Sequence, residues 1–143
     1  MNIAQLIADR DLAQVTTCNV DMTVRDVVAL LADRRIGALP VLQGKQVVGI
    51  FSERDLIYRI ADMGADCLDR PVGEIMTAPA VTVHPQETVL DALSLMTRRR
   101  IRHLPVVDNM GMCGFISIGD LVKSRLDEAR HETEAMRNYI QSS

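Results

Sequence analysis

The chain has 143 residues, of which 48% are hydrophobic and 24% charged, and its formal net charge is −3. This length and mixed composition fit one compact domain, or two small halves that share a core, and exclude disordered and fibrous proteins. The small net charge gives no general attraction to nucleic acid or anionic membranes. No apolar run reaches the roughly 20 residues that a membrane span needs. We therefore expect neither nucleic acid nor a membrane as a partner.

The N-terminus and the cysteines indicate the compartment. Gln5 and Asp9 interrupt the first apolar residues too early for a signal peptide. Cys18, Cys67 and Cys113 are odd in number and far apart, with no CxxC pair, which is typical of a reducing compartment. We expect a cytoplasmic protein whose cysteines are small buried side chains.

An internal repeat organises most of the chain. A shift of 65 residues aligns residues 24–56 with residues 89–121 without a gap, and 13 of 33 positions are identical. A self-match in register over this length indicates a duplication.

The first copy reads as strand, helix, strand, strand, helix. Residues 15–18 predict a short strand, and Thr23 is the expected N-cap of the helix that follows. Residues 39–42 and 47–51 then predict two strands joined by a tight turn. Ser52 is the expected cap of a closing helix.

The second copy repeats this order. Thr88 and Ser117 are the expected caps, and residues 108–111 form the turn. Pro40 and Pro105 are expected where a strand begins, because a sheet tolerates proline there.

The two copies together predict the fold class. A copy of about 50 residues is too small for an adequate core of its own. We therefore expect an α+β protein in which two β-α-β-β-α repeats pack sheet against sheet about a pseudo-twofold axis. Residues 64–73 are interpreted as a hinge between them. The expected divisions are 1–67 (first repeat with the N-terminal segment), 68–124 (second repeat) and 125–143 (C-terminal helical tail).

The tail predicts a contact with another chain. No Gly or Pro interrupts the sequence after Asp120, so a helix should continue to about Ile140. Its apolar and small residues recur at spacings of three and four: Val122, Leu126, Ala129, Thr133, Met136 and Ile140. This heptad-like stripe favours a homodimer, although a helix lying back on its own domain is the alternative.

A motif recurs in both copies and carries a resemblance. Each copy has Leu-Pro-Val, a turn, and then Gly-apolar-apolar-Ser-x-x-Asp, at residues 49–55 and 114–120. The motif resembles the CBS domain, named for cystathionine β-synthase, and two in tandem resemble a Bateman module. The resemblance covers residues 15–124 and extends to small stand-alone bacterial CBS-pair proteins. It implies clefts that bind adenosine compounds: AMP first, then ADP, ATP, NAD(H) or S-adenosylmethionine.

Physical chemistry makes the motif suitable for such a ligand. Glycine at a strand end permits close approach of a ligand, and a serine at a helix N-terminus lies beside N–H groups that favour an anion. A carboxylate can accept two hydrogen bonds from a ribose diol. In family members the aspartate holds the ribose and the serine lies near the ribose or phosphates. Ser-x-x-Asp is also a helix cap that needs no ligand, and the two roles can coexist.

The resemblance implies two clefts, each built from the Ser and Asp of one copy and the early strand of the other. The residues expected in the first cleft are Val15, Thr16, Ile36, Gly37, Ala38, Ser117 and Asp120. Those expected in the second are Ser52, Arg54, Asp55, Ala80, Val81, Ile101, Arg102 and His103.

The copies differ at one informative place. Arg102 and His103 replace Gly37 and Ala38, where AMP-sensing relatives carry phosphate-binding bases, so they are expected to face the phosphates of either ligand. The neighbouring residues 98–100, all arginine, have a simpler explanation as cations at a helix C-terminus.

The sequence predicts a regulatory module and not an enzyme. It contains no Walker A loop, HExxH or GxSxG motif and no cluster of Cys and His. We expect ligand binding to change the relative orientation of the repeats and to signal to a protein effector. The alternatives are a ligand-free dimerisation scaffold and a nucleotide-processing enzyme.

Overall fold

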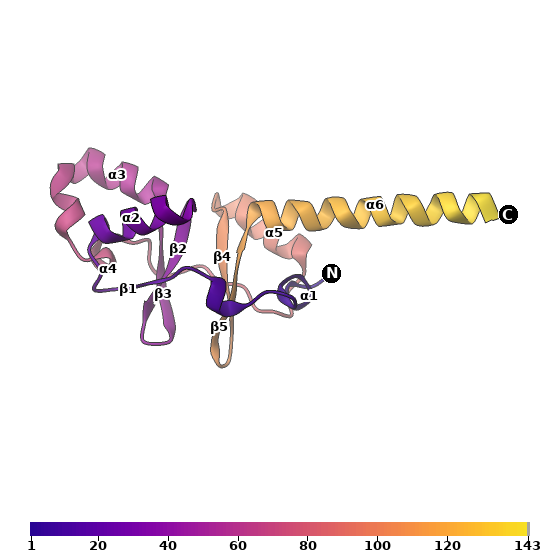
Figure 1. Ribbon diagram of the computed structural model, residues 1–143, viewed down its shortest axis with the longest axis horizontal. Coiled ribbons are helices and arrows are strands. Elements are labelled where there is room, and N and C mark those ends of the chain that lie inside the picture. The colour runs from indigo at the N-terminus through magenta and orange to yellow at the C-terminus, as the bar shows by residue number, and fades with distance from the viewer. Residues whose placement is uncertain (143) are drawn as a thin grey trace.

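A computed structural model describes residues 1–142. Two α+β halves lie side by side, and one long helix extends beyond the second half (Figure 1). The first half contains β1 (Cys18–Asn19), α2 (Val24–Arg34), β2 (Ala38–Gln43), β3 (Gln46–Ser52) and α3 (Glu53–Met63). The second contains α5 (Val89–Arg99), β4 (His103–Asp108), β5 (Gly111–Ser117) and α6 (Ile118–Ser142). Short elements precede each half or join the two: α1 (Ile3–Ile7), the 3₁₀ turn η1 (Leu12–Gln14), the 3₁₀ turn η2 (Gly64–Asp69) and α4 (Val72–Ile75).

The sheets confirm the predicted α+β class. In the first half the strand order is β1-β2-β3, with β1 parallel and β3 antiparallel to β2. In the second half β4 and β5 form an antiparallel pair. The hairpin turns use glycines with positive φ, Gly44 at 63° and Gly111 at 118°, a conformation that glycine adopts without strain. β3 and β5 contact each other across the boundary between the halves.

The duplication extends to the ends of the helices. The Oγ1 atoms of Thr23 and Thr88 accept hydrogen bonds from the N–H groups of Asp26 and Asp91, as predicted for N-caps. At the C-terminal ends of α2 and α5, Arg35 and Arg100 both adopt the left-handed conformation, with φ of 54° and 55°. This geometry lets the last carbonyl groups find donors in the chain that follows.

The two halves exchange their leading helices. α1 precedes the first repeat but packs on the second, where Ile3 is fully buried and its N–H binds the carbonyl of Glu87. α4 precedes the second repeat but packs on the first, through the buried Val72 and Ile75. Figure 1 shows α1 beside the second half and α4 beside the first. Each core therefore depends on a segment that belongs, in chain order, to the other repeat.

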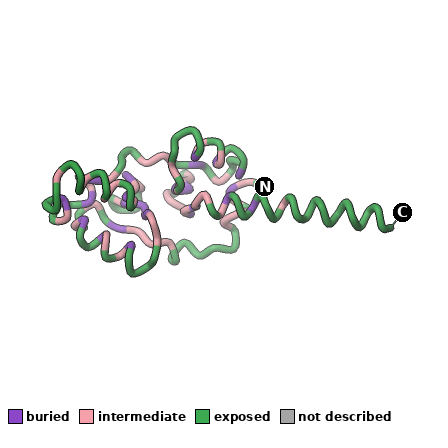
Figure 2. The backbone as a smooth tube through the Cα atoms, turned by 90° about the horizontal axis from the view of Figure 1, so that it is seen from above, coloured by how far each residue is buried: buried purple, intermediate pink, exposed green. Residues whose placement is uncertain are grey.

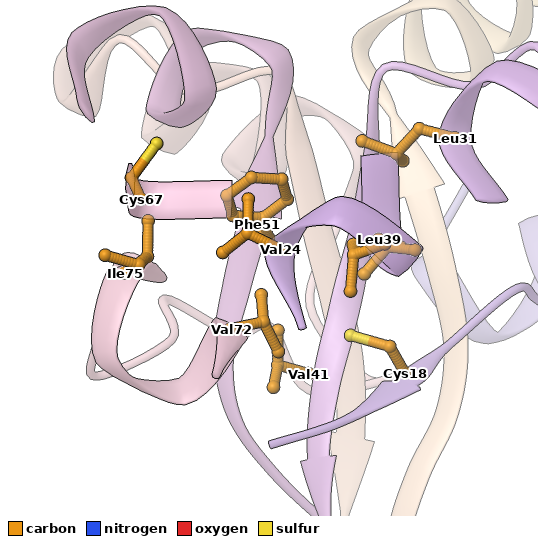
Figure 3. Close-up of a cluster of buried hydrophobic side chains, with 10 residues drawn as sticks. Cys18, Val24, Leu31, Leu39, Val41, Phe51, Cys67, Val72 and Ile75 are labelled. Carbon is orange, nitrogen blue, oxygen red and sulfur yellow. The ribbon is translucent and has the colours of Figure 1, made fainter. Parts of the chain in front are cut away.

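The segment 64–73, interpreted from the sequence as a hinge, packs on the first core through Cys67, Leu68 and Val72, while most of its other residues are exposed. Figure 3 shows Cys67 and Val72 close to Phe51, and all three are fully buried. The segment is fixed by a hydrogen bond from Val24 N–H to the carbonyl of Arg70 as well. Although the segment is rich in Gly, Asp and Pro, its apolar residues Cys67 and Val72 attach it to the core.

The cysteines fit their expected role in part. Cys18 and Cys67 are buried and Cys113 is half-buried, and all three are free thiols. Burial raises the pKa of the Cys18 thiol to about 12, which makes it unreactive.

The first strand is shorter than predicted in both copies. Pairing with β2 begins only at Cys18, because the η1 turn ends at Gln14 and residues 15–17 lie outside the sheet. In the second copy a single bridge between Val83 and Val106 replaces this strand.

The two prolines lie third in their strands and not at the start. Pro40 is opposite Ile50, whose N–H and C=O groups bond to Thr77. The ladder therefore needs no hydrogen bond from Pro40 toward β3, and the missing donor costs little. Pro105 is the equivalent residue of β4, opposite Phe115.

α6 extends far beyond the body of the protein. Figure 2 shows its C-terminal part exposed on all sides. Val122, Leu126 and Met136 are 45%, 60% and 62% exposed. The tail of 125–143 was predicted to be helical, and the helix reaches Ser142; Ser143 lies outside the described residues. None of the helices within residues 1–142 has the length and apolar character needed to cross a bilayer.

Candidate functional site

The first of two clefts, the Asp55 cleft, opens where α3 begins. It has a volume of about 650 Å³. Ser52 and Asp55 form a closed capping box at the helix start: Ser52 N–H and Oγ donate to Asp55 Oδ2 at 3.0 and 3.1 Å. The other carboxylate oxygen, Oδ1, accepts a 2.7 Å hydrogen bond from the hydroxyl of Thr77, which follows α4. The carboxylate is therefore held in place at the wall of the cleft.

The second, the Asp120 cleft, lies at the start of α6 and has a volume of about 600 Å³. Ser117 N–H donates to Asp120 Oδ2 at 2.8 Å, and Ser117 Oγ accepts from Asp120 N–H at 3.2 Å. Here the remaining partner is a cation. Arg10, which follows α1, contacts Oδ2 through Nη1 at 3.2 Å and Oδ1 through Nη2 at 3.1 Å.

The structure brings the residues singled out by sequence into these two clefts. The Asp55 cleft is lined by Ser52, Arg54, Asp55, Ala80, Val81, Ile101, Arg102 and His103. The Asp120 cleft is lined by Val15, Thr16, Ile36, Gly37, Ala38, Ser117 and Asp120. Gly37, Ala38 and His103 line both, so the clefts meet between β2 and β4.

Several lining residues were not predicted from the sequence. In the Asp120 cleft these are Arg10, Asp11, Gln14 and Phe115; in the Asp55 cleft they include Glu53, Tyr58, Thr77 and Arg100. Phe115 could have been found, because it lies two residues before Ser117 in the same strand and so on the same face. Arg10 carries no such signal, because it lies before the duplicated segment.

The motif glycines serve packing and not ligand approach, so that expectation is wrong. A Cβ atom on Gly49 would lie 2.5 Å from Met76 Sδ and 2.8 Å from the carbonyl oxygen of Thr77. A Cβ on Gly114 would lie 3.0 Å from Ile7 Cδ1. The glycine at each place admits part of the exchanged segment: the residues after α4 at Gly49, and the last residue of α1 at Gly114.

The N–H groups at the helix starts are less available to an anion than expected. Glu53 N–H binds the carbonyl of Gly37, and Ile118 N–H binds that of Arg102. Two residues further along each helix, the N–H group of Asp55 donates to the Ser52 hydroxyl and that of Asp120 donates to the Ser117 hydroxyl. A phosphate would therefore depend mainly on side-chain cations.

Cations gather in the Asp55 cleft. Arg54, Arg100 and Arg102 line it, together with the carboxylates of Glu53 and Asp55. Arg54 donates from Nη1 to the carbonyl oxygen of Arg100 at 3.1 Å, a bond that joins α3 to the end of α5 in the other repeat. The helix-end interpretation of residues 98–100 fits Arg98 and Arg99, in the last turn of α5, whereas Arg100 lines the cleft.

His103 lies where the two clefts meet. Burial lowers the pKa of its imidazole below the ordinary 6.5, and the nearby Arg102 cation acts in the same direction, against the opposing effects of Asp120 and Glu53. The ring is therefore mainly neutral at pH 7.

Asp120 keeps its charge despite partial burial. Burial alone would raise the pKa of the carboxyl, but the hydrogen bonds from Ser117 N–H and from Arg10 outweigh it and lower the pKa.

The arrangement can hold a small polar ligand between the repeats. A carboxylate for hydroxyl groups lies in each cleft, and arginines suited to an anion line one of them. Within residues 1–142 no three His, Cys, Asp or Glu side chains come together as metal ligands would.

Comparisons with known proteins agree with the duplicated fold. The model of the CBS domain family matches twice, over residues 7–62 and 72–127. The chain is 41% identical over 129 residues to the mitochondrial CBS domain-containing protein CBSX3 of Arabidopsis thaliana, covering 87% of this chain and 63% of that protein's length. It is 30% identical over 120 residues to the CBS domain-containing protein YhcV of Bacillus subtilis, covering 84% and 85%.

The relatives include an enzyme, but the likeness is confined to a small part of its chain. Inosine-5'-monophosphate dehydrogenase of Mycobacterium tuberculosis is 37% identical over 111 residues, which are 76% of this chain and 20% of the enzyme.

Solved structures share the fold. A CBS-domain containing protein from Agrobacterium tumefaciens is 34% identical with a TM-score of 0.81, covering 87% of this chain and 99% of that one. CBSX2 in complex with AMP is 23% identical with a TM-score of 0.76, over 90% and 98%. The CBS domain pair of protein MJ0100, in complex with 5'-methylthioadenosine and S-adenosyl-L-methionine, is 23% identical with a TM-score of 0.72, over 88% and 98%.

Proposed function

This chain belongs to the CBS domain family as a tandem pair of CBS domains, and on that premise we propose that it is a regulatory module that binds an adenine nucleotide between its repeats. One observation carries the proposal. Each motif aspartate is fixed by its own serine at the wall of a cleft that both repeats line. A carboxylate so placed can accept hydrogen bonds from a ribose diol.

The proposed ligand is AMP, with ADP, ATP or NAD as alternatives. Support comes from the adenosine compounds in the structures of CBSX2 and the MJ0100 pair. Support also comes from the arginines, because Arg54 and Arg102 lie in the Asp55 cleft with side chains that can bind phosphate.

The proposed signal is a change in the relative orientation of the repeats. A ligand in the Asp55 cleft would contact Ser52 from the first repeat and Arg102 from the second. It would therefore stabilise the orientation of the halves that binds it more tightly, by an amount equal to the difference in its binding free energy between that orientation and the others. A protein effector would read that orientation, and no chemical step is needed.

We further propose that the protein is a homodimer through α6, with a second copy of the same helix as the occupant of its exposed face. Val122, Leu126 and Met136 are exposed and follow the heptad pattern. Glu132 and Arg137 are five residues apart, the spacing at which opposite charges pair across a parallel two-helix coiled coil. A reducing compartment such as the cytoplasm suits the three free thiols.

A thermal-shift panel tests the function. AMP, ADP, ATP and NAD are each added at millimolar concentration, with inorganic phosphate as control. A ligand at 100 times its Kd adds ~2.7 kcal/mol to the free energy of unfolding and should raise the Tm by several degrees. If none of the four raises the Tm, the scaffold alternative is favoured. Release of phosphate from ATP during the incubation would instead indicate an enzyme.

A further inference from the structure

Each motif aspartate has a partner in the segment that follows an exchanged helix, but the two partners differ in chemistry. Thr77 and Arg10 each follow a short exchanged helix, and each contacts the aspartate of the repeat on which that helix packs. Thr77 contacts Asp55 with a hydroxyl. Arg10 contacts Asp120 with a charged fork that reaches both carboxylate oxygens.

The hydrogen-bond inventory shows why this difference matters. A carboxylate has about four acceptor positions. Asp55 already accepts three hydrogen bonds, from Ser52 N–H, Ser52 Oγ and Thr77 Oγ1. Asp120 also has three partners, which are Ser117 N–H and the two Arg10 nitrogens. A ribose diol needs two positions, so in each cleft one existing partner has to leave.

The cost of that departure is unequal. At Asp55 a hydroxyl can rotate and give its proton to another acceptor, because O–H groups turn freely. At Asp120 the Ser117 N–H is fixed in the backbone, so at least one of the two hydrogen bonds from Arg10 has to break. This ion pair is partly shielded from water, with side chains 40% and 32% exposed, and its two charged hydrogen bonds are stronger than neutral ones.

The charges of the lining residues also favour binding in the Asp55 cleft. Three arginines and two carboxylates line the Asp55 cleft. Arg10 is the single arginine among the residues that line the Asp120 cleft, together with Asp11 and Asp120. An anionic nucleotide is therefore attracted to the Asp55 cleft and not to the other.

We propose that Arg10 competes with the ligand for Asp120, so that the Asp55 cleft fills first and the Asp120 cleft binds only when Arg10 releases its aspartate. The inference rests on the proposed function, since it concerns the order and strength of binding at the same two clefts. Arg10 is thus the residue that makes a duplicated pair of sites unequal.

The test is calorimetry with adenosine, whose lack of charge isolates the competition for the carboxylate. Asp55→Ala leaves the Asp120 cleft to be measured alone, and Asp120→Ala leaves the Asp55 cleft. We expect adenosine to bind at least tenfold more weakly in the first variant than in the second. Adding Arg10→Met to Asp55→Ala should then strengthen binding about tenfold, because methionine keeps the apolar stem and removes the fork. Arg25→Met is the matched control, because it breaks an exposed Arg–Asp pair (Arg25–Asp69) outside both clefts.

The outcomes separate the two proposals. Equal affinities in the single variants, or an unchanged or weaker affinity after Arg10→Met, would overturn the competition while leaving nucleotide binding intact. No binding of adenosine or AMP to the wild-type protein would overturn the proposed function and this inference with it. Thermal melts check that each variant is folded, and Asp55→Asn, which keeps an acceptor for Ser52 N–H, replaces Asp55→Ala if the alanine variant is unfolded.

Discussion

The rings of His103 and Phe115 stack with centroids 5.6 Å apart and planes 12° apart. His103 lines both clefts and Phe115 lines the Asp120 cleft, so the pair forms part of the wall where they meet. The stack explains part of the burial that keeps the imidazole neutral.

His103 should make stability depend on pH. Its pKa is lowered in the folded protein, so the unfolded chain takes up the proton first as pH falls. The free energy of unfolding is therefore highest above pH 6.5 and should decrease as pH falls from 6.5 toward the folded-state pKa. Urea unfolding between pH 7.5 and 5.5 measures this. His103→Phe should flatten the profile over this range, whereas His131→Gln, on the exposed part of α6, should keep the wild-type profile. A His103→Phe profile as steep as that of the wild type would show that another group is responsible.

Arg102 should distinguish phosphate-bearing ligands. A charged hydrogen bond is worth ~1.5–3 kcal/mol, so adenosine should bind at least tenfold more weakly than AMP at the Asp55 cleft. Arg102→Ala should remove most of that preference while the protein stays folded, because the side chain is exposed at the end of a loop. Arg98→Ala, an exposed arginine of α5 outside both cleft linings, is the control. Equal affinities for AMP and adenosine in the wild type would mean that Arg102 does not contact phosphate.

Gly49 should be intolerant of substitution for a reason unrelated to ligand. An alanine Cβ would meet the backbone carbonyl of Thr77 at 2.8 Å, and forcing it in should cost about 1–3 kcal/mol of stability. Gly119→Ala is the comparison, because its nearest neighbour would be Ser117 Oγ at 3.6 Å. Denaturant midpoints that shift equally in the two variants would contradict this packing account.

Removal of residues 129–143 should weaken self-association without unfolding the repeats. The segment lies beyond both buried clusters, so the cores remain complete. Light scattering at micromolar concentration should give a dimer for the full chain and a larger monomer fraction for the truncated one. A full-length monomer would contradict the dimer, and a truncated dimer would place the interface elsewhere.

Local chemistry explains what the sequence could predict. Thr23, Thr88, Ser52 and Ser117 cap helices because their hydroxyls satisfy nearby N–H groups, and the hairpin turns follow from Gly44 and the equivalent turn of the second copy. Because the motif recurs in both repeats, the sequence also predicted one cleft for each of the two aspartates.

Long-range packing explains what the sequence could not predict. The exchange of α1 and α4 leaves no trace in the repeat, because both helices lie outside the aligned segments. Arg10 was missed for this reason, and the composition of residues 64–73 does not reveal that Cys67 and Val72 pack into the first core.

Calorimetric titration of AMP is the decisive experiment, because it measures whether Asp55 and Asp120 both hold an adenine nucleotide. The wild-type protein, the two single alanine variants at Asp55 and Asp120, and the double variant are compared after melts confirm that each is folded. We expect binding to the wild type, loss of the stronger site in Asp55→Ala, loss of the weaker site in Asp120→Ala, and no binding to the double variant. Wild-type affinity in the double variant, or no binding of AMP to the wild type, would overturn the proposed role of the two aspartates.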